Sequence, residues 1–121
     1  MKINPLTFLI LIIMFGCNAG TGSNEETNVE VVISNGKLQC QDNAIPIGTS
    51  KSNLTDSGIL VKQEGCGVQK GVDFPAVCGA ATGQFHIFTI SEDDLNKAEN
   101  IGFISSSNFE EGFELVACNS L

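Results

Sequence analysis

The sequence predicts an α+β domain, on the evidence of three features that recur along the chain. Residues 29–33, 59–63 and 85–90 are rich in β-branched and aromatic side chains and have the length of strands. Residues 91–101 have the apolar spacing of a helix, and a weaker helical segment covers residues 49–57. A glycine follows each helical segment, and an apolar run follows each glycine. The order strand, helix, strand is therefore expected twice.

The second helix has the clearest local signals. Ser91 can cap its first turn, and the carboxylates of Glu92–Asp94 lie at the positive end of its dipole. Asp93 and Lys97 stand four residues apart, a spacing that favours an ion pair on a helix. Gly102 is expected to end the helix in the left-handed conformation. One apolar face is expected from Leu95, Ala98 and Ile101.

Two β-α-β units in succession predict a ferredoxin-like sandwich, in which two helices cover one face of an antiparallel sheet. Phe113–Cys118 then forms either the fourth strand or an additional one. The alternative is a hairpin, because Asn35-Gly36 is typical of a two-residue turn between residues 29–34 and 37–41. With that hairpin, the first helix would be lost and the sheet would gain a strand.

The composition indicates one folded domain and excludes one class of partner. A chain of 121 residues is long enough for one ordinary domain, and 42% apolar with 17% charged residues suits a packed core. Six Lys, no Arg and 14 acidic residues give a formal charge of −8. Nucleic-acid binding is not expected, because phosphate contacts need a clustered positive surface.

The N-terminus is typical of an export signal. Lys2 precedes an apolar run over residues 6–15 that only Thr7 interrupts. This run has half the roughly 20 residues that a membrane-spanning helix needs. A basic start, a short apolar run and small residues after it predict a secretory signal peptide over residues 1–16.

The end of this run, Met14-Phe15-Gly16-Cys17, resembles the lipobox of bacterial lipoproteins. The resemblance implies a diacylglyceryl group on the Cys17 thiol, cleavage between Gly16 and Cys17, and acylation (typically with palmitate) of the new amine. The mature chain would have 105 residues, and 5 Lys against 14 acidic residues would give it a charge of −9. In a Gram-negative host, Asn18 in place of aspartate implies the outer membrane, with the domain facing the periplasm.

The region after Cys17 is expected to be a lipidated, flexible tether over residues 17–28, followed by one domain over residues 29–121. Residues 18–28 contain no large apolar side chain, so they cannot bury enough surface to offset the entropy of ordering. Several acyl chains would hold the protein on the membrane, since each buried methylene contributes about 0.8 kcal/mol.

Four further cysteines predict two disulfides, because an exported domain meets an oxidising environment. Their spacing lacks the Cys-x-x-Cys pattern of structural zinc sites and of thioredoxin-like sites. If the ferredoxin-like strand order 4-1-3-2 holds, all four lie at one end of the sheet, and neighbouring strands pair Cys66 with Cys78 and Cys40 with Cys118. The alternative pairs Cys40 with Cys66 and Cys78 with Cys118.

Few other residues suggest chemistry, and no cofactor or metal site is predicted. His86 is the sole histidine, and no Gly-x-Ser-x-Gly motif or Ser-His-Asp spacing accompanies it. Cys78–Gly83 lacks the ending of a phosphate-binding loop and is expected to be a turn beside a disulfide. Asp73–Val77 is either an exposed recognition tip or a lid on the core. The acidic triplet at residues 92–94 and the acidic pair at residues 110–111 are better explained by dipole capping and solvation than by cation binding.

These features favour a non-catalytic interaction module of the cell envelope, which binds another exported protein or a cell-wall component. Such a module needs an exposed apolar patch or sheet edge, for example around Phe74 or Phe109. The alternative is a small periplasmic hydrolase or thiol-redox enzyme that uses His86 or a cysteine. That enzyme would need a pocket where His86 reaches a nucleophile or a carboxylate.

Overall fold

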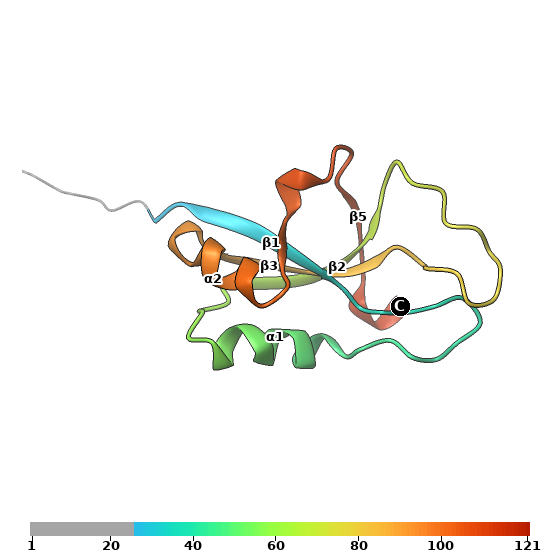
Figure 1. The fold of residues 1–121 in the computed structure, drawn as a ribbon, viewed down its shortest axis with the longest axis horizontal. Helices are drawn as coiled ribbons and strands as arrows, with labels where there is room; N and C mark the ends of the chain where they lie inside the picture. The colour runs from blue at the N-terminus through green and yellow to red at the C-terminus, as the bar shows by residue number, and fades with distance from the viewer. Residues whose placement is uncertain (1–25) are drawn as a thin grey trace, which may run out of the picture.

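The computed structural model describes residues 26–121, and this part of the chain forms one five-stranded sheet with two helices (Figure 1). The strand order is β4-β1-β3-β2-β5, and every neighbouring pair is antiparallel. The predicted α+β class is therefore confirmed. The elements are β1 (Asn28–Ser34), α1 (Ile47–Asp56), β2 (Gln63–Gln69), β3 (Gln84–Ser91), α2 (Leu95–Asn100), β4 (Ile104–Ser105) and β5 (Phe113–Val116).

The main core lies between the helices and one face of the sheet. Val31 of β1 and Phe88 of β3 are register partners and are both fully buried. Leu54 of α1 and Ala98 of α2 pack into the same cluster, so both helices cover this face (Figure 1). Because side chains alternate along a strand, the residues on either side of Val31 in β1 and of Phe88 in β3 point to the opposite face. The core cluster consists of Val31, Leu54, Ile59, Phe88, Ile90, Ala98 and Phe103.

Both helices end in the same way, as the repeated glycine predicts. After α1, the N–H of Ile59 donates to the carbonyl of Leu54, and Gly58 has φ of +80°. After α2, the N–H of Phe103 donates to the carbonyl of Ala98, and the preceding glycine has φ of +102°. These are Schellman motifs, in which the residue after the glycine packs back onto the helix. Ile59 and Phe103 are accordingly buried.

The start of the second helix differs from the prediction. Residues 92–94 form a separate 3₁₀ turn, and Ser91 ends β3 without a side-chain capping bond. Lys97 pairs with Asp94 at 3.6 Å, in place of Asp93. Ile101 is exposed, because it lies after the last residue of α2, where the backbone has left the helical conformation.

The expected strand over residues 59–63 is wrong except for its last residue. Ile59 is buried against the C-terminal end of α1, and Leu60 points to solvent with 70% of its surface exposed. β2 begins at Gln63 and pairs along its length with β3. Its sequence, QEGCGVQ, has little intrinsic strand preference, so the pairing with its neighbours determines its conformation.

The hairpin alternative at Asn35-Gly36 is also wrong. The Asn35 side chain is buried and donates through Nδ2 to Oε1 of Gln84 at 2.9 Å, which ties the end of β1 to the start of β3. Gly36 has φ of +73°, and the chain then runs through a long loop into α1. The first helix, α1, is therefore present.

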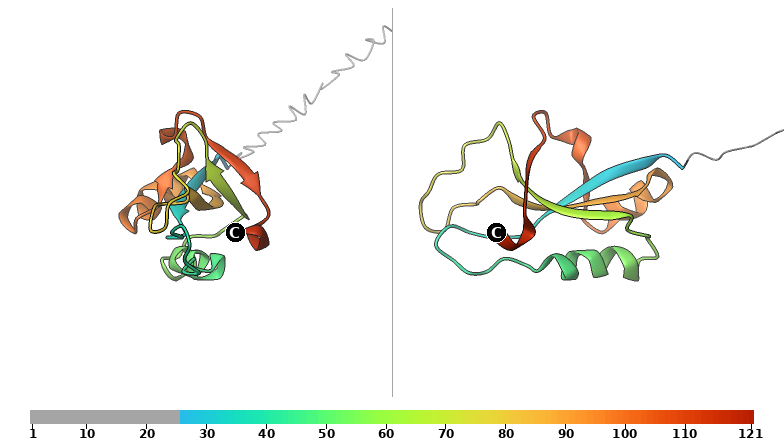
Figure 2. Two further views of the ribbon diagram at one scale, coloured as in Figure 1. Left: turned by 90° about the vertical axis from the view of Figure 1, so that its right-hand side faces the viewer. Right: turned by 180° about the vertical axis from the view of Figure 1, so that it is seen from behind.

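β5 is the additional strand. Ile104–Ser105 occupies the place beside β1, whereas Phe113–Val116 pairs with β2 at the opposite edge of the sheet. The connection between them crosses the face that the helices leave free (Figures 1 and 2). There Phe109 packs against Phe85 and Phe113, with ring centroids 5.5 and 4.8 Å apart. This aromatic cluster anchors the connection.

Two disulfides are present, as predicted, but both pairings proposed from the sequence are wrong. The bonds join Cys40 to Cys78 and Cys66 to Cys118. Because β5 lies beside β2, Val116 is the register partner of Cys66, and Cys118 follows two residues later. Cys40 and Cys78 lie in the two long loops at one end of the sheet, where Leu38 and Ala81 form a β-bridge.

The domain begins slightly before the expected boundary. β1 starts at Asn28, and the carbonyl of Thr27 accepts a hydrogen bond from the N–H of Glu92 at 2.8 Å. Glu26 pairs with Lys62 at 2.9 Å. Residues 26–28, expected as the end of the tether, thus contact the folded domain.

Candidate functional site

A small cavity of about 130 Å³ lies at the end of the sheet from which α1 departs. His86 lines it from β3, and the Cys66–Cys118 disulfide lines it from β2 and the C-terminal turn. Cys66 and His86 are register partners, so the strand pairing itself places the disulfide beside the imidazole. The remaining lining residues are Asn35, Ala44, Ile45, Pro46, Ile47 and Leu121.

A hydrogen bond links His86 to α1. Ser50 Oγ lies 2.7 Å from Nδ1 of His86, and both residues are 3% exposed. Ser50 and Leu54 stand four residues apart on α1 and face the sheet together. Ser50 is not among the residues expected from the sequence, although its spacing of four from Leu54 is the signal that identifies a buried serine.

The burial of His86 favours its uncharged form. Desolvation lowers the pKa of His86 below its ordinary value of 6.5. The side chains around the cavity contribute no carboxylate that would oppose this effect. His86 therefore holds a neutral imidazole against Ser50 near pH 7.

This arrangement is poorly suited to hydrolysis. Ser50 does not line the cavity, so its hydroxyl is not presented to a substrate. A serine nucleophile also needs its base to be oriented by a third group, and the cavity lining supplies no acidic side chain for that role. The Ser50–His86 pair instead joins a helix to a strand with a satisfied buried hydrogen bond.

The second surface feature is a groove on the face of the sheet opposite the helices. It has a volume of about 130 Å³ and is called the open groove here. Leu115 of β5 borders it and is 74% exposed, although it is a large apolar side chain. β5 is also an edge strand, since it pairs only with β2 within the described part of the chain. The open groove is lined by Glu30, Gln63, Glu64, Gly65, Ile87, Thr89 and Leu115.

The aromatic residues expected to form a binding patch are used for packing. Phe74 is half-buried, and its ring lies against Gly83, where an added Cβ would overlap it. The segment Asp73–Val77 is thus held to the neighbouring loop through Phe74, while Val77 is exposed. Phe109 belongs to the aromatic cluster with Phe85 and Phe113.

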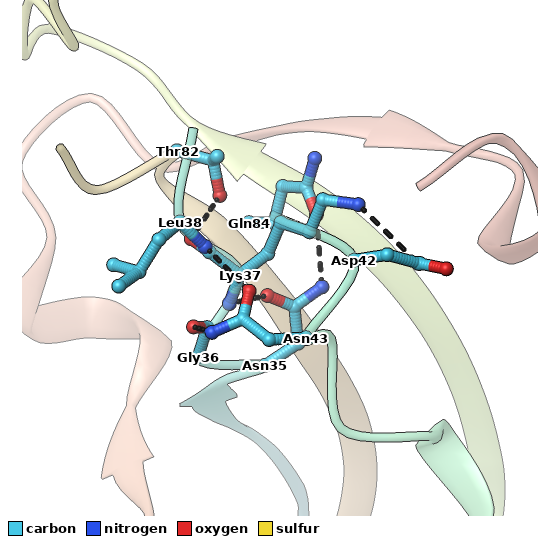
Figure 3. A network of polar contacts seen from close by, with 8 residues as sticks. All are labelled: Asn35, Gly36, Lys37, Leu38, Asp42, Asn43, Thr82 and Gln84. Atoms are coloured by element: carbon cyan, nitrogen blue, oxygen red, sulfur yellow. Dashed lines mark hydrogen bonds and ion pairs between the residues drawn. The ribbon is translucent and has the colours of Figure 1, made fainter. Parts of the chain in front are cut away.

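The two long loops, residues 35–46 and 70–83, extend together from one end of the sheet (Figures 1 and 2). A polar network holds the first loop (Figure 3). Asn43 Oδ1 accepts from the N–H of Leu38 at 3.0 Å, and its Nδ2 donates to the carbonyl of Gly36 at 3.2 Å. Thr82 Oγ1 donates to the carbonyl of Lys37 at 2.8 Å, which joins the second loop to the first.

The acidic clusters remain at the surface. Glu92 and Asp93 are exposed in the 3₁₀ turn before α2, and Glu110 and Glu111 are exposed before β5. Within residues 26–121, no group of three or more His, Cys, Asp or Glu side chains is placed to hold a metal ion.

The predicted lipid-attachment residue, Cys17, and the signal peptide over residues 1–16 lie outside the described residues. Among the helices of residues 26–121, none has the length and apolar character needed to cross a bilayer. No family model, curated protein or solved structure matches the chain.

Proposed function

We propose that this chain is a membrane-anchored lipoprotein of the bacterial cell envelope, and that its domain is a non-catalytic module that binds another exported protein. The Met14-Phe15-Gly16-Cys17 motif supports the anchor, with Cys17 as the lipidated N-terminus after removal of residues 1–16. A tether from Cys17 then leads to the domain, whose first strand begins at Asn28. In a Gram-negative host, Asn18 in place of aspartate supports a position at the outer membrane, with the domain facing the periplasm.

The proposal includes a ferredoxin-like sandwich that β5 extends. The order of β4, β1, β3 and β2 and the position of both helices on one face support it. β5 adds an edge beside β2, and that edge is the feature on which the proposed binding depends.

One observation carries the binding function, namely the exposure of Leu115 on an edge strand beside the open groove. Edge strands present unpaired backbone groups, and proteins protect them with charged side chains (especially Lys), Pro, short strand length or a covering segment. β5 has the sequence FELV, in which Glu114 is the one charged residue and Lys and Pro are absent. An extended segment of a partner can pair with such an edge while one of its side chains enters an adjacent pocket.

The charges around the open groove indicate the chemistry of the partner. Glu30 and Glu64 line it. Lys51 lies 3.8 Å from Glu64 and offsets only that carboxylate. The partner segment is therefore expected to combine an apolar residue, which contacts Leu115, with Lys or Arg beside Glu30.

The alternative is a hydrolase or thiol-redox enzyme that uses His86 or a cysteine. The surroundings of His86 support the binding module over a hydrolase. The Ser50–His86 hydrogen bond is buried, and Ser50 does not line the cavity beside His86, so its hydroxyl is not presented to a substrate. The open groove, by contrast, is bordered by an exposed apolar side chain.

The binding test places a photo-crosslinking residue at position 115 in intact cells. Position 60 is the matched control, because Leu60 is 70% exposed but lies outside the open groove. A crosslinked protein is expected from position 115 and not from position 60. With that protein purified, Leu115→Glu should weaken binding at least tenfold, as expected when a charge replaces an apolar contact. Equal crosslinking from both positions, or unchanged binding by Leu115→Glu, would contradict the proposal.

The anchor is tested separately through Cys17→Ser. The wild-type chain is expected in the membrane fraction and should incorporate labelled palmitate. The variant should lose the label and appear in the soluble exported fraction or as the uncleaved precursor. Palmitate incorporation that persists in the variant would exclude Cys17 as the attachment site.

A further inference from the structure

The two disulfides occupy different surroundings. Cys118 is exposed but Cys66 is 2% exposed in the sheet, so cleavage of their bond would leave the Cys66 sulfur buried. Cys40 and Cys78 are both exposed, at a distance from the core in the paired long loops. A thiolate that leaves into water is favoured over one that leaves into an apolar interior. Attack on the Cys40–Cys78 bond can therefore release a solvated thiolate from either cysteine.

The backbone at Cys40 is in an unfavourable conformation. Cys40 has φ of +66°, and it is the one non-glycine residue with positive φ among residues 26–121. Such a residue persists only where the surrounding structure holds it, and this kind of strain is concentrated at functional sites. Opening the disulfide removes one of the constraints that hold Cys40 in this conformation.

Hydrogen bonds hold the two loops together independently of the disulfide. The N–H of Gln39 donates to the carbonyl of Ala80 at 2.8 Å, and the N–H of Gly79 donates to the carbonyl of Gln39 at 3.0 Å. The Thr82 hydroxyl adds a third bond, to the carbonyl of Lys37. The Cα atoms of the two cysteines are 5.0 Å apart. After reduction, these contacts would keep the two thiols close enough to close the bond again.

We propose that Cys40–Cys78 is a thiol–disulfide exchange site that accepts electrons from a dithiol of another exported protein, whereas Cys66–Cys118 is structural. A thiolate of the dithiol attacks one sulfur, the S–S bond breaks, and the other cysteine leaves as a thiolate that takes up a proton. The second thiol of the partner loses its proton and displaces the bound cysteine, which is released as a thiolate and protonated in turn. The partner dithiol thus becomes a disulfide by losing two electrons and two protons, and the Cys40–Cys78 pair gains them.

This site is separate from the proposed binding at β5, because the two involve different residues. Neither Cys40 nor Cys78 lines the open groove. The exchange proposal therefore does not depend on the binding proposal.

The experiment uses the full chain isolated from membranes in detergent. It is equilibrated with defined ratios of reduced to oxidised dithiothreitol, quenched with acid and alkylated, and mass spectrometry then identifies each labelled cysteine. Cys40 and Cys78 should become labelled together at a dithiol ratio roughly tenfold or more below that needed for Cys66 and Cys118. The circular dichroism spectrum should stay native at that ratio. Reduction of both pairs in one step, or of Cys66–Cys118 first, would overturn the proposal.

A second variant tests the role of the loop contacts. Thr82→Ala removes the side-chain bond between the loops, so the reduced thiols should separate more and the bond should open at a dithiol ratio about fivefold lower. Thr55→Ala is the matched control, because Thr55 donates to the carbonyl of Ser52 on the exposed face of α1. Equal ratios for wild type and Thr82→Ala would show that the loops do not hold the thiols together. Loss of selective labelling in Thr55→Ala would overturn the assignment of the site to the loops.

Discussion

Ser50 Oγ lies 2.7 Å from Nδ1 of His86, and this buried hydrogen bond joins α1 to the middle of the sheet. It replaces the solvent contacts that both groups lose on folding. The sole histidine thereby has a defined structural partner. Four predictions about the stability of the domain, which concern this hydrogen bond, His86, Gly67 and the two disulfides, can be tested on the purified protein.

Ser50→Ala should lower the free energy of unfolding by about 1–3 kcal/mol, because it leaves a buried ring nitrogen without its partner. Urea unfolding followed by circular dichroism measures the change. Ser52→Ala is the control, since Ser52 is exposed on the same helix and donates only to the carbonyl of Gly48. A Ser50→Ala variant as stable as the Ser52→Ala variant would show that the buried bond contributes nothing.

Stability should fall as the pH is lowered from 7 to 5. Burial lowers the pKa of His86 in the folded state, so the unfolded chain takes up a proton near the ordinary pKa of 6.5 while the folded chain does not. The stabilisation is thus present above pH 6.5 and is lost as the pH falls toward the folded pKa, by at most about 1.4 kcal/mol per pH unit for one proton.

Urea unfolding at a series of pH values measures this slope. Glu26 also has a lowered pKa, chiefly because the Lys62 side chain hydrogen-bonds to it. Its effect on stability is lost only as the pH falls below the ordinary carboxyl pKa of 4.5, which is outside the range from pH 7 to 5. His86→Gln should therefore remove the slope between pH 7 and 5. A slope that persists in that variant would assign the titration to another group.

Gly67→Ala should destabilise the domain by about 1–3 kcal/mol, because a methyl group there would overlap its neighbours. An added Cβ would lie 2.8 Å from Cδ1 of Ile87 and 3.1 Å from Cβ of Phe113. Gly65→Ala is the matched control two residues earlier in β2, where no atom lies within 4 Å of the added Cβ. Thermal unfolding of both variants distinguishes them. Similar losses at both positions would point to strand conformation as the cause, in place of packing.

Removal of the Cys66–Cys118 disulfide by Cys66→Ala/Cys118→Ala should cost about 4 kcal/mol, the chain-entropy value for a separation of 52 residues. Removal of the other disulfide by Cys40→Gly/Cys78→Ala should lower the free energy of unfolding by clearly less. The chain-entropy term alone would be similar, because it depends on the logarithm of the separation and 38 residues is close to 52 on that scale. Glycine at position 40 tolerates the φ of +66° that strains the cysteine. Guanidinium unfolding gives both values, and equal losses would show that the strain at Cys40 is negligible.

The local features of the fold were predictable because they depend on short-range interactions. The alternation of Val29, Val31 and Ile33 and the apolar run of residues 85–90 correspond to β1 and β3. The repeated glycine after each helix corresponds to two Schellman motifs, whose bonds span only five residues. An even set of cysteines correctly implied two disulfides.

The candidate sites were less predictable, since each depends on segments far apart in the chain. β2 has the weakly strand-forming sequence QEGCGVQ and is a strand because β3 and β5 pair with it on both sides. The exposure of Leu115 and the approach of Ser50 to His86 likewise depend on how separate elements pack.

Sequence alone thus determined the class of the domain, the ends of its helices and the number of its disulfides, because periodicity and left-handed glycine stops are encoded within a few neighbouring residues. The tertiary structure decided that β5 adds beside β2, and this single choice also determined that Cys118 pairs with Cys66. Two edges of the sheet were available to a short strand. The packing of Phe109 and Phe113 on Phe85 favours the edge beside β2, and no local pattern records a contact between residues so distant in sequence.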